Sequence, residues 1–161
     1  GMKIVFSVIF AVLLAACSSL EITTSSPLFL QDKNQSITLF ALENYTDTPQ
    51  AGMRASNLIE GVLLSEGYNV VKSIELGHKN LNEQLQIAQN NGSEYLLNGG
   101  VSEWRYKTGI DGEPAISLQC KLIDVRSKKV VWSATASSND WGNSSIGTTA
   151  QAMIESMFEV R

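Results

Sequence analysis

Apolar and polar residues alternate along the C-terminal half of the chain with the period of a β-strand. Within the strand expected at 114–125, every second position from 116 to 122 is apolar, while the positions between carry serine, glutamine and lysine. Further strands are expected at residues 94–106 and 129–137, and the charged turn 126–128 joins the last two strands in a hairpin. A three-stranded meander with one apolar face needs helices to cover that face.

A helical period of apolar residues marks the segments that can provide this cover. Residues 50–66 carry one continuous apolar stripe, and residues 81–91 and 145–160 repeat the pattern. Short apolar runs at 36–42 and 68–72 indicate two more strands. The expected order is therefore β-α-β-α-β-β-β-α, an α/β sandwich in which helices cover a mixed five-stranded sheet.

The first sixteen residues have the pattern of a signal peptide. Met2 is the expected biological start, with Gly1 as an added residue, and Lys3 supplies the positive charge that precedes an apolar run at 4–14. The run is too short to cross a bilayer, which takes about 20 apolar residues. We therefore expect residues 1–16 to be removed.

The residues that follow suggest a lipid anchor. Residues 14–17 read Leu-Ala-Ala-Cys, which resembles the bacterial lipobox and implies cleavage before Cys17 and its acylation with chains such as palmitate. Ser18, rather than aspartate, then favours the periplasmic side of the outer membrane. The alternative is a plain secretory signal that contains a cysteine. Residues 18–35 are expected to form a tether, in which Leu28–Leu30 docks on the domain or a neighbour, and residues 36–161 a single α/β domain.

Composition excludes several classes of function. Removing Lys3 with the signal leaves 11 basic and 16 acidic residues, a formal charge of −5, which disfavours binding to nucleic acid. His78 is the only histidine, so the sequence holds no histidine pair for a metal, and it contains no Gly-x-Ser-x-Gly motif of a serine nucleophile. We expect no enzyme activity and no cofactor, and we expect Cys120 to be a small core residue without a disulfide.

Two loops carry the candidate functional residues. Asp111 and Glu113 flank Gly112 in the loop between two strands, and Glu103 lies just before this loop. In a monomer these acids would form an ordinary solvated turn, and the alternative is the carboxylate pair of a glycosidase. In a symmetric ring the same residues would recur around an axis, and their electrostatic fields would add. Trp141 lies in a polar loop, where it either packs under the last helix or contacts a lipid or partner surface.

Several segments resemble the PelC family, the outer-membrane lipoproteins of Pel exopolysaccharide export. They are ENYTDTPQAG (43–52), VSEWRYKTGIDGEPAISL (101–118), VVWSATASSNDWG (130–142) and the amphipathic helix at the C-terminus. The order of elements is also similar to that of the lipoproteins CsgG and LpoB, so fold alone does not select the function. A lipoprotein activator of a peptidoglycan synthase therefore stays an alternative.

The resemblance implies a homo-oligomeric ring of about twelve subunits at the mouth of a PelB-like export barrel. The ring would gather a cationic polysaccharide on an electronegative periplasmic face and meet the membrane through a belt of tryptophans, to which Trp141 corresponds. From their place in the sequence, we assign Asp111 and Glu113 first to this electronegative face, and Glu103 after them.

Overall fold

The structure, a computed structural model, describes residues 18–25, 29–30, 32–73, 79–106, 114–140 and 145–158. Its elements are β1 (Ser18–Thr24), β2 (Ser36–Phe40), β3 (Glu43–Asn44), α2 (Ala51–Ser65), β4 (Asn69–Ser73), α3 (Leu81–Asn90), β5 (Tyr95–Arg105), β6 (Ala115–Asp124), β7 (Val130–Asp140) and α4 (Ile146–Met157).

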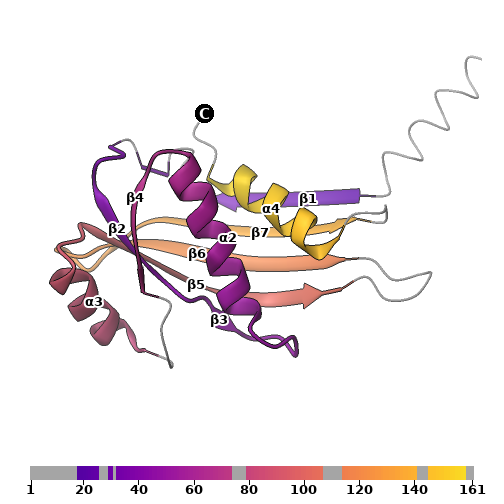
Figure 1. The fold of residues 1–161 in the computed structure, drawn as a ribbon, viewed down its shortest axis with the longest axis horizontal. Coiled ribbons are helices and arrows are strands. Elements are labelled where there is room, and N and C mark those ends of the chain that lie inside the picture. The colour runs from indigo at the N-terminus through magenta and orange to yellow at the C-terminus, as the bar shows by residue number, and fades with distance from the viewer. Residues whose placement is uncertain are drawn as a thin grey trace, which may run out of the picture.

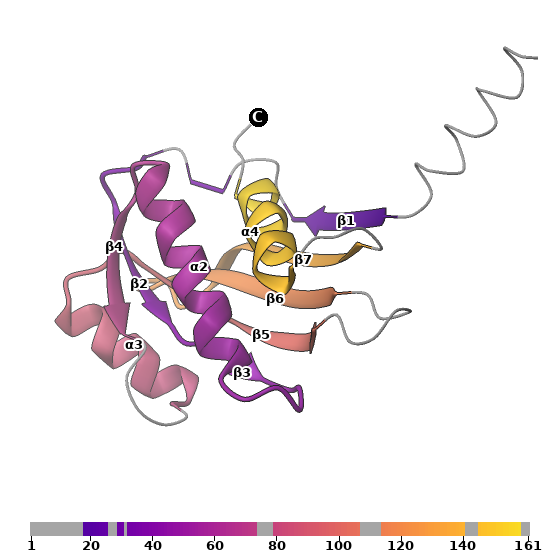
Figure 2. The same ribbon diagram turned by 45° about the vertical axis from the view of Figure 1, so that its right-hand side comes forward.

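The strands form one mixed sheet in the order β1-β7-β6-β5-β2-β4, and β3 pairs with β5 (Figure 1). Strands β1, β7, β6 and β5 are antiparallel, whereas β2 runs parallel to both β4 and β5. Helices α2 and α4 lie together across one face of the sheet, as Figure 2 shows from a second angle. The predicted α/β class is confirmed, and the eight expected strands and helices occur in the expected order, together with two further strands.

The sheet has seven strands rather than the five expected. The two strands that the sequence analysis did not predict are β1 and the short β3. Residues Ser18–Thr24, expected as part of a tether, pair antiparallel with β7. Leu20 and Ile22 alternate with Glu21 and Thr23, so the segment has the period of a strand despite its polar composition. The pairing covers the edge of β7, whose backbone groups would otherwise lack partners.

The main core lies between the sheet and helices α2 and α4. At one end of it, the ring of Phe29 contacts those of Tyr68, Trp132 and Phe158, with centroids 5.2, 4.7 and 4.9 Å away and ring planes close to perpendicular. Phe29 is only 4% exposed, so it docks on the domain itself, which was one of the two expectations for its segment.

Helix α3 covers part of the opposite face. Leu85 and Ala88 of the helix form a second, smaller core with Phe40, Leu96 and Ile123 of the sheet. This core lies over β2 and the adjoining parts of β5 and β6. The outward side chains of β1, β7 and most of β6 are left exposed or half-exposed on that face.

The pairing of β1 can be tested with a disulfide. Glu21 lies directly opposite Ser137, and cross-strand neighbours of this kind are close enough for a disulfide between two cysteines. Thr135 lies on the same face of β7 but two residues further along, opposite Thr23. With Cys17 replaced by serine, we expect the double variant Glu21→Cys/Ser137→Cys to oxidise almost completely, as measured by thiol titration. The control pair Glu21→Cys/Thr135→Cys should stay mostly reduced. Equal oxidation of both pairs would indicate a mobile tether.

The docking of Phe29 can be tested by truncation. Because the ring is enclosed by three aromatic side chains, Phe29→Ala should lower the free energy of unfolding by about 3–5 kcal/mol. Leu64→Ala, at a side chain that is 52% exposed on α2, should change it by less than about 0.5 kcal/mol. Urea denaturation of the unlipidated domain measures both values. A loss below 1 kcal/mol for Phe29→Ala, on the same scale, would contradict the packing.

Candidate functional site

Four strand ends meet at one edge of the molecule. Ser18 of β1 faces Asp140 of β7, Asn139 of β7 faces Ala115 of β6, and Ala115 faces Arg105 of β5. The starts of β1 and β6 and the ends of β5 and β7 therefore lie side by side, on the right in Figure 1. We call this edge the loop end.

The sequence-predicted residues Cys17, Asp111, Glu113 and Trp141 lie outside the described residues, as does His78. Four of these five residues, all except His78, nevertheless belong to segments that begin or end at the loop end. Cys17 directly precedes β1, Trp141 directly follows β7, and the segment that holds the two acids joins β5 to β6. The topology thus gives Cys17, Trp141 and the acidic loop neighbouring points of attachment.

Glu103 is the one predicted site residue that the structure describes. It lies in β5 opposite Ser117, next to a β-bulge, and its Oε1 atom is 3.3 Å from Nη2 of Arg105. The two side chains are 44% and 56% exposed, so solvent screens this ion pair strongly. Because the guanidinium offsets the carboxylate charge, Glu103 adds less negative charge to the loop end than its position in the sequence indicates.

A contact that the sequence did not reveal links α2 to the loop end. Arg54 of α2 donates a hydrogen bond to the hydroxyl of Tyr106, the residue that follows β5. Its guanidinium carbon also lies 5.9 Å from the centre of the tyrosine ring, within the range of a cation–π interaction. This contact ties the start of the acidic segment to the helix layer.

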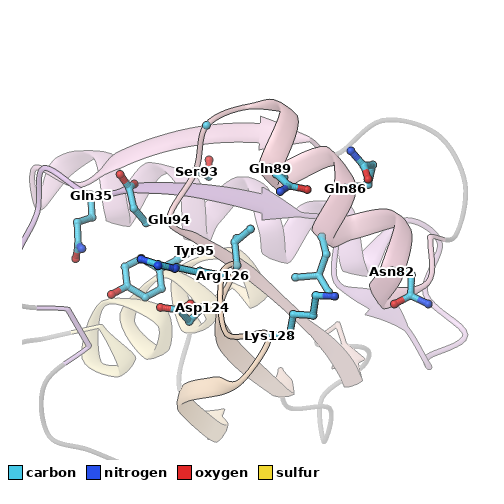
Figure 3. Close-up of a pocket in the computed structure, with 13 residues that line it drawn as sticks. Gln35, Asn82, Gln86, Gln89, Ser93, Glu94, Tyr95, Asp124, Arg126 and Lys128 are labelled. Atoms are coloured by element: carbon cyan, nitrogen blue, oxygen red, sulfur yellow. The ribbon is translucent and has the colours of Figure 1, made fainter.

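A groove of about 740 Å³ lies at the opposite end of the sheet, between α3 and the turn that follows β6 (Figure 3). Amide side chains of α3 line one wall, and charged residues line the other. Glu94 accepts a 2.6 Å hydrogen bond from the backbone N–H of Ser36, and Asp124 accepts one of 2.8 Å from that of Ser127. Arg126 and Lys128 balance these two carboxylates, so the groove has no net formal charge.

Cys120 and the acidic residues are candidate reactive or metal-binding groups within the described ranges. Burial raises the pKa of the Cys120 thiol to about 12, so this side chain stays protonated and acts as a small core residue, as predicted. Within the described ranges, no three histidine, cysteine, aspartate or glutamate residues cluster as metal ligands. No helix in the same ranges is long and apolar enough to cross a membrane.

Solved structures similar to this chain include the PelC dodecamer from Paraburkholderia phytofirmans in two crystal forms. In one form the identity is 31% and the TM-score 0.73, over 87% of this chain and 94% of the other. In the second form the values are 29% and 0.78, over 89% and 100%. No family model and no curated protein matches the sequence.

More distant structures share the fold alone. The lipoprotein GNA1162 from Neisseria meningitidis is 24% identical with a TM-score of 0.54, over 68% of this chain and 85% of its own. The LpoB C-terminal domain from Salmonella enterica is 15% identical with a TM-score of 0.53, over 68% and 86%. The sequence identity to PelC is thus higher than the identity to these two proteins, which share only the fold. On the similarity over almost its entire length, this chain belongs to the PelC family.

Proposed function

We propose that this protein is a non-enzymatic, lipid-anchored protein of the outer membrane that assembles into a ring. The ring guides a cationic exopolysaccharide, Pel, toward a PelB-like export barrel during secretion of the biofilm matrix. The observation that carries the proposal is the 31% identity to a dodecameric PelC over 87% of the chain. The neighbouring attachment points at the loop end support it.

The start of β1 fixes the orientation of each subunit in this proposal. With Cys17 acylated, β1 begins at the very next residue, and one residue spans only about 3.5 Å. Each buried methylene of the anchor contributes about 0.8 kcal/mol, so two or more chains hold the protein stably at the bilayer. The loop end therefore faces the membrane, where Trp141 would contact lipid headgroups.

In this orientation the acidic loop would lie on the membrane side of the ring, next to the barrel, rather than on the periplasmic face that the resemblance implies. One negative charge at about 10 Å interacts with a cation by only about 0.4 kcal/mol in water. About a dozen such charges around an axis would together contribute a few kcal/mol. Screening over about 8 Å in physiological salt confines this attraction to the mouth. A cationic polymer would thus be drawn in without being held.

Neutralising the acidic loop tests the role of charge. In the lipidated protein in nanodiscs, Asp111→Asn/Glu113→Gln should weaken binding of glucosamine hexamers by about tenfold or more at low salt. The control Glu83→Gln/Glu155→Gln removes the same charge from α3 and α4 and should cause less than about a threefold loss. Isothermal titration calorimetry measures both affinities. Equal losses in the two double variants would show that only total charge matters.

Replacing Trp141 distinguishes its two interpretations. If the side chain lies at the membrane, Trp141→Ala in an unlipidated Cys17→Ser background should lower binding to anionic vesicles severalfold and leave the midpoint of thermal unfolding unchanged. Leu64→Ala, at an exposed apolar side chain of α2, serves as the control for both readouts. Unchanged vesicle binding with a fall of several degrees in the midpoint would instead place Trp141 under the last helix.

A further inference from the structure

The part of the sheet that α3 leaves uncovered is a polar surface, which we call the open face. In one row across it, Thr23 of β1 pairs with Thr135 of β7, which pairs with Gln119 of β6, which pairs with Gly100 of β5. The neighbouring rows carry serine, glutamate, lysine and asparagine. The exposed side chains of this face thus offer mostly hydroxyl and amide groups.

An aromatic ring lies on the open face. Tyr45 follows β3, and its side chain is 66% exposed. Its Cε2 atom lies 2.6 Å from the position that a Cβ atom on Gly100 would occupy. Glycine at position 100 therefore leaves the space that the ring fills, and any larger residue would displace the ring from the sheet.

The loop that carries Tyr45 is braced by hydrogen bonds. The backbone N–H of Tyr45 donates to the carbonyl of Val101 at 2.9 Å. Asn44 Oδ1 accepts hydrogen bonds from the backbone N–H and the hydroxyl of Thr46, and the hydroxyl of Thr48 donates to the carbonyl of Trp104 at 2.6 Å. The backbone that carries the exposed ring is thus held in place before any ligand binds, which lowers the entropic cost of binding.

Two adjoining hollows flank the ring and share Tyr45 and Gln119 in their linings. One, of about 310 Å³, extends toward β1, and serine and threonine supply five of its eleven lining residues. The other, of about 300 Å³, extends toward α3, where Asn98 donates a 2.8 Å hydrogen bond to Gln84. The charged residues that line the two hollows are Glu21, Glu43, Lys79 and Lys121, whose formal charges cancel.

We propose that the open face is a binding site for a saccharide chain with little or no charge. A sugar ring has an apolar C–H face and a rim of hydroxyl groups. The C–H face would stack on Tyr45, because the negative face of an aromatic ring attracts weakly positive hydrogen atoms. The amides of Gln119 and Asn98 and the hydroxyl groups around them would hydrogen-bond the rim.

This inference rests on the proposed function and adds to it, since each subunit would have a saccharide-binding site that does not depend on net charge. The acidic loop would attract the cationic sugars of a polymer, and the open face would bind its uncharged sugars. The balance of charges on the open face suits this ligand better than it suits a strongly basic or acidic partner. Because stacking survives salt and attraction between exposed charges does not, the two roles can be separated.

The test measures binding of chitohexaose, an uncharged hexamer of N-acetylglucosamine, to the lipidated protein in nanodiscs in about 0.5 M salt. We expect Tyr45→Ala to weaken binding by about tenfold or more and Tyr45→Phe to stay within about twofold. Gln119→Ala should cause about a threefold or greater loss. Tyr106→Ala removes an exposed tyrosine from the loop end and should have no effect, and Asp111→Asn/Glu113→Gln should also keep full affinity.

The proposal is overturned if the unaltered protein does not bind the hexamer, or if Tyr45→Ala binds it as well as the unaltered protein does. It is also overturned if Tyr45→Ala lowers the mass of the assembly, measured by mass photometry, without changing glycan affinity, since the open face would then be a contact between subunits. None of these results would affect the role of the acidic loop, which is measured with glucosamine hexamers at low salt.

Discussion

The pairing of β1 with β7 is the constraint on which the rest of the proposed function depends. The strand starts at Ser18, one residue after the expected lipid anchor, and runs in register along β7 from Asp140 to Ala134. A flexible tether would leave the domain free to turn in any direction below the membrane. In the proposed function, a strand in its place fixes the sheet relative to the anchor, so that one end would face the bilayer and the other would face away.

This constraint gives different surroundings to the polar parts of the surface. The segment with Asp111 and Glu113 joins β5 to β6 at the loop end, the proposed membrane side, whereas the groove next to Glu94 and Asp124 lies at the far end of the sheet. The open face with Tyr45 lies between them. A polymer moving toward the membrane would meet weak contacts of two kinds, stacking that tolerates salt and attraction that acts over about a Debye length. Weak contacts of this kind orient a chain and still allow it to slide.

Most of the fold follows from the periodicity of the sequence. Helices α2, α3 and α4 and the five longer strands besides β1 each carry an apolar face or run, which locates them within a few residues. The strand β1 was missed because serine and threonine dominate it and because it pairs with the distant end of the chain. Local sequence carries no sign of such a long-range pairing.

The candidate sites were less predictable than the fold. Cys17, Trp141 and the acidic loop stand out by local pattern, but that the strand ends next to them lie side by side depends on register. Tyr45 was hidden for the same reason, since only the β3–β5 pairing brings it over Gly100. The ion pair of Glu103 with Arg105 was visible in principle, because the two residues are two apart in a strand and share a face.

The orientation of the sheet at the membrane is tested most directly by the depth of spin labels. Tyr106 lies at the loop end and Arg126 in the turn after β6, separated by about 30 Å along a strand of ten residues. With labels at Tyr106→Cys or Arg126→Cys in the lipidated protein on vesicles, we expect relaxation by lipid-soluble oxygen only at position 106. At position 126 a water-soluble nickel complex should dominate. Equal depth at the two positions, or a deeper label at 126, would contradict the orientation that β1 imposes.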